Sequence, residues 1–519
     1  MRRRRRPAKP RGKKFRTRTL FIRGAIALGL LLLSAVSAEL GWRALWAARR
    51  LFHRRPAADS FELYGVGEST AAGEPYGSPM ALASLVDDEL GGRVGGRRIV
   101  VVDRSRRSES VFPQAVALSH EIRLRFSGVP GAVLVYTGHN DDGAPRALTL
   151  KERLEELFVF RSWLLTDLLF YAENYAPSLR PVLGVWSLRW YELNMRRIVA
   201  MSLDAGLVPI VSTVVGNRAG MGPALGVDSK LTGKEACAIL REGWALEAEG
   251  RYAEAMRFYA DQVGFVSRLR PFLDFRLGRC ESRLGRYRKA ERLFRETRNL
   301  EYGDNYHCAT SRQNDYLRAL ARIEHVPLVD AAAIFREHSP HGLIGNNLFS
   351  DGHHPNAAGY ALLANAYSET LANRFPGTSY RPFKSARDLF RRLGFSREAR
   401  AAALRDAGRW LLSVSAGHYA PSERVELARR RFSLALSLDP NSCSGWIGLG
   451  LATAAQGCGF MADPSNLDFL ERLHLGYSGY HPSKTEMPEI LKKLRDAGVP
   501  GEMTGKIETV CGRRDDASI

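Results

Sequence analysis

The sequence predicts an α/β protein in which a parallel β-sheet carries helices on both faces. Short apolar runs rich in β-branched residues alternate along the chain with segments of helical periodicity, which is typical of such a sheet. Helical stretches interrupt this alternation and also follow it. The 519 residues allow two or three domains, and the 45% hydrophobic content suits a globular protein with a core.

The formal charge of +21 is concentrated at the N-terminus, where residues 1–23 hold twelve Arg and Lys and no acid. The remaining chain has 64 basic against 55 acidic residues. Residues 19–38 form an apolar run interrupted only by Arg23. Because a cationic flank stays in the cytoplasm and about 20 apolar residues span a bilayer, we expect 1–18 to be a basic cytoplasmic tail and 19–46 a transmembrane signal anchor.

This topology predicts a single-pass protein of the cell inner membrane whose body is extracytoplasmic, in the periplasm. The small residues Val36, Ser37 and Ala38 also resemble a cleavage site, so a removed signal peptide is an alternative. Apolar and aromatic residues that continue through Trp46 favour a retained anchor. A basic tail for RNA needs no membrane-length apolar run behind it, so we expect no nucleic-acid partner.

The cysteines predict neither a zinc site nor a disulfide framework. No two of them form a CxxC pair, so a zinc site of the usual spacing is not expected. We expect buried thiols with at most one disulfide. The cysteines are residues 237, 280, 308, 443, 458 and 511.

The apolar runs define five expected strands, and two helical segments, 81–90 and 111–126, separate the first three of them. The carboxyl ends of parallel strands lie at one edge of a sheet, which is where an active site is expected. The five strands are residues 61–67, 98–103, 132–138, 207–215 and 327–332.

The expected α/β domain is built from residues 59–232 and a closing segment, 301–376. Residues 144–200 are aromatic-rich and helical in pattern, and predict a helical cap inserted into the first part. Residues 377–519 predict a C-terminal helical region.

Residues 233–300 predict a second insertion, made of helical repeats. The pattern Gly250–Ala255 recurs as Gly285–Ala290, each copy lying between apolar helical runs. This resembles tetratricopeptide repeats, and a related pattern at 428–457 resembles them in the C-terminal region. A plain structural insert and a groove that binds a protein partner remain equal alternatives.

Polar motifs follow three of the expected strands. Ser69 lies on a turn between two glycines, a position from which a hydroxyl can attack a carbonyl carbon. Asn140 follows the third strand and offers a side-chain amide to a developing oxyanion. Asp351 precedes His354 by three residues, so its carboxylate can orient the imidazole that takes the serine proton.

The order of these motifs resembles that of the SGNH, or GDSL-type, hydrolases. The segment 326–364, VPLVDAAAIFREHSPHGLIGNNLFSDGHHPNAAGYALLA, is similar to the closing segment of that family. The resemblance implies a flavodoxin-like three-layer fold and no metal or other cofactor. It implies Ser69 as nucleophile, Asn140 as oxyanion donor, His354 as base and Asp351 as its orienting acid.

The chain departs from the family pattern at three places. Glu68 stands where the family usually has Asp, and Asp103 where it has Asn. The loop after the second strand lacks the glycine whose N–H completes the oxyanion hole, and Ser108 is the best candidate for that position. This loop also contains three arginines, which either form a solvated basic loop or bind an acidic substrate: Arg104, Arg106 and Arg107.

The sequence therefore predicts a membrane-anchored, extracytoplasmic serine hydrolase that acts on acyl esters as an esterase, deacetylase or acyltransferase. Envelope polysaccharides are among the expected acyl-ester substrates. The alternative is a non-catalytic envelope scaffold that binds proteins through its repeats and retains a vestigial hydrolase fold.

Overall fold

The structure is a computed structural model, and the chain divides into two compact units. The first contains Met1–Arg55, Ser119–Phe126 and Leu148–Val185, and the second contains the rest. The residues that the structure describes are 13–53, 55–141, 153, 161–175, 188–223, 233–265, 270–300, 308–416, 422–456, 466 and 486–512.

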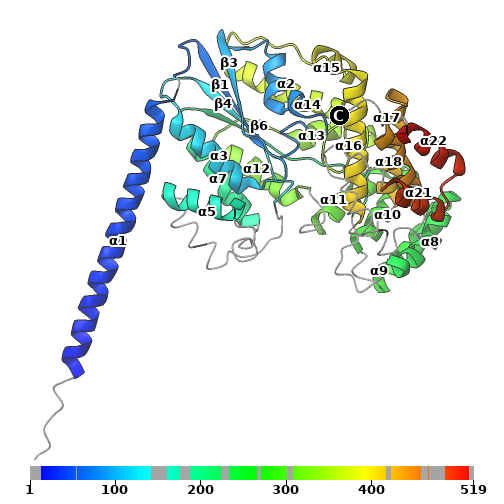
Figure 1. Cartoon of the computed structure of the whole chain (residues 1–519), viewed down its shortest axis with the longest axis horizontal. Helices are drawn as coiled ribbons and strands as arrows, with labels where there is room; N and C mark the ends of the chain where they lie inside the picture. The colour runs from blue at the N-terminus through cyan, green and yellow to red at the C-terminus, as the bar shows by residue number, and fades with distance from the viewer. Residues whose placement is uncertain are drawn as a thin grey trace, which may run out of the picture. The chain divides into compact units, whose positions relative to one another are not determined.

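The second unit contains a mixed α/β fold with a mostly parallel sheet (Figure 1). The strands lie in the order β2-β3-β1-β4-β5-β6, and only β2 is antiparallel to its neighbour. The prediction of an α/β fold with a parallel sheet is confirmed. The strands are β1 (Ser60–Gly67), β2 (Arg93–Val94), β3 (Arg97–Asp103), β4 (Gly131–Tyr136), β5 (Val208–Ser212) and β6 (Leu328–Val329).

All five predicted strands are present, but the last two are shorter than their apolar runs, and β2 was not predicted. It forms a hairpin with β3 through Gly95 and Gly96, whose φ angles are 54° and 78°. Two successive residues with positive φ are what a tight two-residue hairpin turn requires, and glycine adopts them without strain. The Gly-Gly pair was therefore a signal for this hairpin.

Helices cover both faces of the sheet, which explains why every residue of β1 and β4 is buried. On one face α2 (Leu82–Glu89) and α13 (Ala331–Glu337) pack beside α14 (Ala357–Arg374). The other face carries α3 (Val111–Leu124), α7 (Leu188–Asp204) and α12 (Ser311–Ile323). Of the predicted cap at 144–200, the part that forms α7 is thus a crossover helix packed on β5; residues 144–152, 154–160 and 176–187 lie outside the described residues.

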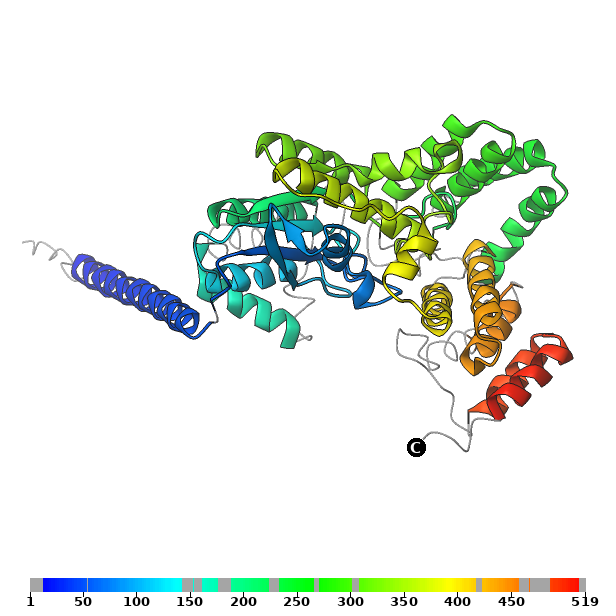
Figure 2. The same cartoon turned by 90° about the horizontal axis from the view of Figure 1, so that it is seen from above.

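The predicted insertion at 233–300 forms two helix pairs, in which consecutive helices pack against one another (Figure 2). Gly250 and Gly285 end the first helix of each pair with φ angles of 75° and 76°. In both copies of the motif, the glycine thus adopts the left-handed conformation that commonly ends a helix. The four helices are α8 (Gly233–Ala248), α9 (Tyr252–Phe265), α10 (Arg270–Arg283) and α11 (Tyr287–Leu300).

The C-terminal region is also helical, as predicted, and one disulfide joins Cys443 to Cys511. Cys280 and Cys308 are buried thiols, whereas the side chains of Cys237 and Cys458 lie outside the described part. The helices are α15 (Ala386–Arg392), α16 (Arg397–Ala416), α17 (Ser422–Leu438), α18 (Cys443–Ala454), α21 (Met487–Asp496) and α22 (Gly501–Gly512).

A buried ion-pair network connects the insertion with the C-terminal region. Arg276 of α10 pairs with Glu247 of α8 and with Glu423 of α17, and all three side chains are at least nine-tenths buried. Removing one partner of such a network leaves an uncompensated buried charge. The insertion is therefore held by the C-terminal helices as well as by its own chain ends.

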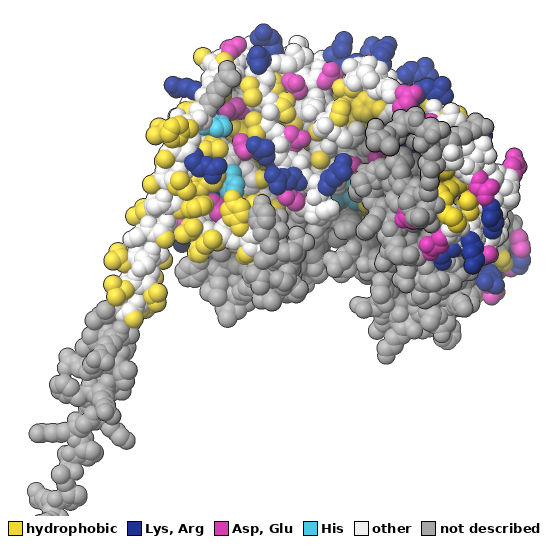
Figure 3. Space-filling model, viewed as in Figure 1, with side chains coloured by type: hydrophobic (Ala, Val, Ile, Leu, Met, Phe, Trp, Pro, Cys, Tyr) yellow, Lys and Arg dark blue, Asp and Glu magenta, His cyan; other side chains and the backbone are white. Residues whose placement is uncertain are grey.

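The first unit contains α1 (Lys13–Leu51) and α5 (Trp163–Tyr175). In the described part of the chain, Ala27–Leu51 is the one segment long and apolar enough to cross a membrane. Its leucines are all at least 47% exposed, and apolar side chains are visible along the helix in Figure 3, whereas Trp46 is buried. This is compatible with the predicted anchor.

A buried carboxyl in the second unit makes its stability depend on pH. Glu89 at the end of α2 is 1% exposed, and its carboxylate accepts the N–H of Phe383 at 2.8 Å. Burial raises the pKa of Glu89 from 4.5 to about 7. The unfolded chain therefore releases this proton at lower pH than the folded chain does, so the contribution to stability falls as the pH rises from about 4.5 to about 7.

We predict that Glu89→Gln, which keeps an acceptor for Phe383 and carries no charge, removes this dependence. Thermal unfolding midpoints should show wild type losing stability relative to the variant between about pH 5 and pH 7.5. A difference that stays constant over this range would mean that Glu89 is already ionised in the folded protein at acidic pH.

Candidate active site

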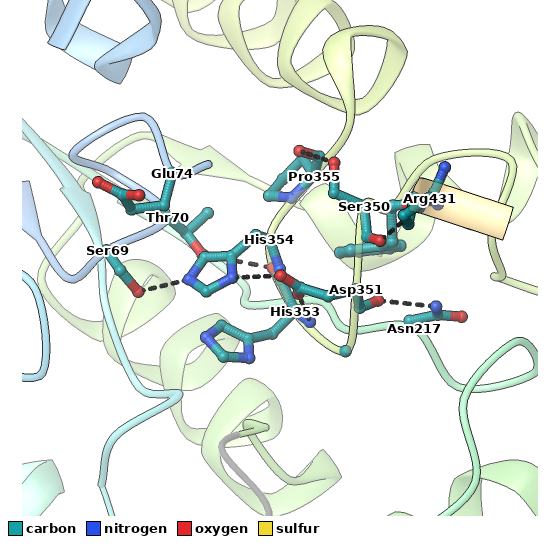
Figure 4. Close-up of polar contacts among 12 residues, drawn as sticks. Ser69, Thr70, Glu74, Asn217, Ser350, Asp351, His353, His354, Pro355 and Arg431 are labelled. Carbon is teal, nitrogen blue, oxygen red and sulfur yellow. Dashed lines mark hydrogen bonds and ion pairs between the residues drawn. The ribbon is translucent and has the colours of Figure 1, made fainter. Parts of the chain in front are cut away.

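Ser69, His354 and Asp351 form one hydrogen-bonded chain (Figure 4). The Nε2 atom of His354 lies 2.7 Å from the Oγ of Ser69, and its Nδ1 lies 2.7 Å from an Oδ of Asp351. All three side chains are buried. The structure thus brings together the three predicted residues, although Ser69 and His354 are 285 positions apart.

The turn after β1 holds Ser69 in place. The Ser69 carbonyl accepts the N–H of Glu74, and the Glu68 carbonyl accepts that of Ala72. Gly67 is required because a Cβ there would lie 2.4 Å from the Tyr136 carbonyl oxygen. The hydroxyl is therefore presented at the carboxyl end of a central strand.

The loop before α14 orients the imidazole. One Asp351 oxygen accepts the N–H groups of His353 and His354, which leaves the other for the His354 ring. If Nδ1–H donates to the carboxylate, Nε2 is left to accept the serine proton. Asn356 then caps α14 by accepting the N–H groups of Ala358 and Gly359, which fixes where the loop ends.

Glu68 connects the serine turn with the loop after β4. Its carboxylate accepts the backbone N–H groups of three consecutive residues, Gly138, His139 and Asn140, at 2.8 to 3.1 Å. It also accepts the hydroxyl of Thr137. The sequence showed Glu68 only as a departure from the family pattern and did not indicate this role. No local signal could have revealed it, because its partners lie about seventy positions away.

The two predicted oxyanion donors lie on neighbouring loops. Ser108 has a φ of 59°, so the chain adopts there the left-handed conformation that a glycine adopts without strain. Its loop lies against β1, because the Arg106 N–H donates to the Gly67 carbonyl. The Asn140 amide donates one hydrogen to the Glu109 carbonyl, and an amide has a second to offer.

The arginines after β3 have protein partners. Arg107 pairs with the buried Glu74, and Arg106 pairs with Glu109. Burial raises the pKa of Glu74, while Arg107 and His354 act in the opposite direction. Two of these arginines therefore stabilise carboxylates of the protein itself, which weakens the expectation that this loop is a free site for an acidic substrate.

The C-terminal region contributes an aromatic side chain beside the triad. Trp410 of α16 lies edge-on to the rings of His353 and His354, with centroid distances of 5.2 and 5.7 Å. The His353 ring also lies 4.9 Å from that of His139. No motif surrounds Trp410 in the sequence, so its place in the site was not predicted.

Arginines from the helical regions hold the loops that carry Asp351. Arg431 of α17 donates to the carbonyls of Phe349 and Ser350. Arg298 of α11 donates to the Asn217 carbonyl, and the Asn217 amide in turn donates to the Asp351 carbonyl at 2.7 Å. Both helical regions therefore support the acid of the triad.

Asp351, His353 and His354 also lie close enough together to hold a metal ion by distance alone. Both Asp351 oxygens and both His354 ring nitrogens already take part in the hydrogen bonds described above. A metal ion would have to replace the contacts that connect Ser69 with Asp351. The arrangement of the donors therefore favours proton transfer over metal binding.

No model of a known protein family matches the chain, and no curated protein matches it significantly.

We predict that Glu68→Gln weakens the site. An amide nitrogen would then face a backbone N–H, and an unpaired buried donor costs about 1–3 kcal/mol. The thermal unfolding midpoint and the rate of reaction of Ser69 with a phosphonate probe should both fall. Glu68→Asp keeps two acceptor oxygens and should lose less of each. A larger loss in Glu68→Asp than in Glu68→Gln would contradict this role, because it would show that side-chain length matters more than the second acceptor oxygen.

Proposed function

We propose that this protein is a membrane-anchored, extracytoplasmic serine hydrolase of the SGNH kind that acts on acyl esters. The observation that carries the proposal is the hydrogen-bonded chain of Ser69, His354 and Asp351, in which both links measure 2.7 Å. Ser69 lies near the beginning of the α/β domain in sequence, and Asp351 and His354 lie near its end. In the structure they meet at the carboxyl ends of the strands. The order of the parallel strands, β3-β1-β4-β5-β6, supports the flavodoxin-like fold that the family resemblance implies.

The proposed reaction begins when Ser69 attacks the acyl carbon of an ester and His354 Nε2 takes its proton. Asp351 stabilises the imidazolium that forms. Asn140 and the backbone N–H of Ser108 are the proposed donors to the oxyanion of the tetrahedral intermediate. His354 then returns the proton to the leaving alcohol, and the acyl group remains on Ser69.

The acyl-serine then reacts with a second hydroxyl compound, again with His354 as base. If that compound is water, the product is a free acid and the enzyme is an esterase or deacetylase. If it is a sugar hydroxyl, the enzyme is an acyltransferase. Acyl esters on envelope polysaccharides suit an extracytoplasmic enzyme that is tethered to the membrane, and we propose them as substrates.

We predict that Ser69→Ala and His354→Ala abolish hydrolysis of a small aryl ester by the full-length protein in detergent. Asn140→Ala should reduce the rate on the order of a hundredfold, the usual effect of a lost oxyanion donor. A phosphonate probe directed at serine should label wild type and not Ser69→Ala.

The matched control is His338→Ala, which removes an exposed histidine on the C-terminal side of α13 and should leave the rate unchanged. Each variant is first shown to unfold at the wild-type temperature. If wild type takes up no probe and is no faster than Ser69→Ala, the chain is better explained as a scaffold that binds proteins through its helical repeats.

We also predict the topology: residues 59–519 lie outside the cytoplasm and the N-terminus lies inside. The reason is that moving the cationic residues ahead of the apolar helix across a bilayer is energetically unfavourable. A reporter fused after Ile519 should be active only if it works outside the cytoplasm. Activity of a fused reporter that works only in the cytoplasm would contradict both the topology and the anchor.

A further inference from the structure

In the helix α5 of the first unit, two polar side chains are buried while three large apolar side chains are exposed. Thr166 and Asp167 are almost completely buried, at 0% and 1% exposed. Leu165, Leu168 and Tyr171 are 43%, 54% and 44% exposed. A spacing of three places these last residues on one side of the helix, where they form an apolar stripe. Helices of water-soluble domains show the opposite arrangement.

Hydrogen bonds of the buried Asp167 carboxylate fix the inner face of α5. Asp167 accepts the indole N–H of Trp42 at 2.8 Å and a guanidinium N–H of Arg123 at 2.7 Å. The His120 ring lies 2.8 Å from its other oxygen. These contacts lower the pKa of Asp167 to about 2, although burial opposes them. The position of α5 against α1 and the end of α3 is therefore well defined.

Hydrogen bonds to Glu39 of α1 hold the N-terminus of α5 in place. The carboxylate of Glu39 accepts the Ser162 hydroxyl at 2.7 Å and the N–H groups of Trp163 and Leu164 at 3.0 Å. An acid from α1 thus caps the N-terminus of α5. Arg43, one turn further along α1, pairs with Glu39 and lies over the Trp163 ring.

Within Ala27–Leu51 all charged residues lie from Glu39 onward, so the uncharged part of the helix, which belongs to the apolar run at 19–38, ends at Glu39. Before it, α1 has leucines that are about 60% exposed, Leu30 to Leu33 among them. After it come Arg43, Arg49 and Arg50, which favour the aqueous side. If α1 is the proposed anchor, α5 begins where the span meets the extracytoplasmic water.

The length and direction of α5 suit an interfacial helix. Its 13 residues extend about 20 Å, which is too short to span a bilayer. Figure 1 shows its axis running across that of α1. Trp42 follows Glu39 by three residues in α1, and the Trp163 ring lies beneath the Arg43 guanidinium. Such rings are enriched at the level of lipid headgroups.

We propose that α5 lies in the extracytoplasmic interface of the bilayer, with Leu165, Leu168 and Tyr171 inserted among the lipid acyl chains. The proposal rests on the proposed membrane anchor, against which α5 packs. The partner is therefore lipid, and the polar contacts of Asp167 and Glu39 hold the two helices together at the membrane surface.

The test uses the full-length protein in vesicles of phosphatidylcholine and phosphatidylglycerol whose acyl chains carry a photoactivatable diazirine. After illumination, mass spectrometry locates the lipid adducts. We expect adducts on Leu165, Leu168 and Tyr171 and on the leucines of α1. Leu434 of α17, which is 49% exposed in the second unit, should carry none.

The double variant Leu165→Glu, Leu168→Glu should lose the adducts on Tyr171, because two carboxylates would keep the stripe out of the hydrocarbon. The matched control, Leu284→Glu with Leu434→Glu, changes two exposed leucines of the second unit and should leave the adducts on Tyr171 unchanged.

Adducts on α1 without adducts on α5 would overturn the inference and leave the anchor intact. Absence of adducts from both helices would refute the anchor itself. A benzoylphenylalanine in place of Leu168 should cross-link to lipid. A covalent dimer would instead show that a second copy of the chain covers the stripe, which would also overturn the inference.

Discussion

The carboxylate of Glu68 is the contact on which the candidate active site depends most. It lies next to Ser69 in the chain and accepts three successive backbone N–H groups of the loop that carries Asn140. One side chain thereby sets the distance between Ser69, the proposed nucleophile, and a proposed oxyanion donor. Burial raises its pKa to about 7, whereas its four hydrogen-bond donors favour the ionised form. The geometry of the site is therefore sensitive to the charge of a group that takes no part in the proposed reaction.

The helical regions are structural parts of the site. Arg431 from α17 and Arg298 from α11 donate to backbone carbonyls that position the loop of Asp351. Trp410 from α16 packs against the imidazoles of His353 and His354. An α/β domain without these helices would lack the contacts by which Arg431, Arg298 and Trp410 hold Asp351 and His354. This explains why helices inserted into the domain and appended to it belong to one compact unit with the sheet.

The sequence predicted those parts of the structure that depend on local pattern. Ser69 directly follows β1, and the loop with Asp351 and His354 follows β6 beyond α13. Because parallel strands place their carboxyl ends at one edge of a sheet, the meeting of these residues could be expected. The repeated Gly250 and Gly285 motif likewise predicted the helix pairs.

Contacts between distant residues were not predictable in this way. The partners of Glu68 and Trp410 lie far along the chain and have no motif of their own. The insertion was expected as a helical excursion, but the buried pair of Arg276 and Glu423 links it to a helix more than a hundred residues later. The positive φ of Ser108 was also not predictable, because most residues other than glycine adopt a positive φ only with strain.

The separation of 285 positions between Ser69 and His354 has a consequence for how the chain matures. If the chain that follows the proposed anchor crosses the membrane in the order of its sequence, Ser69 emerges long before its proposed base His354, and Trp410 and Arg431 emerge later still. Contacts between such distant residues form slowly, because a large loop must close before they contribute. The hydroxyl of Ser69 thus has no base beside it during most of its passage. The proposed reactivity of Ser69 therefore depends on the finished chain and not on the segment that carries the serine alone.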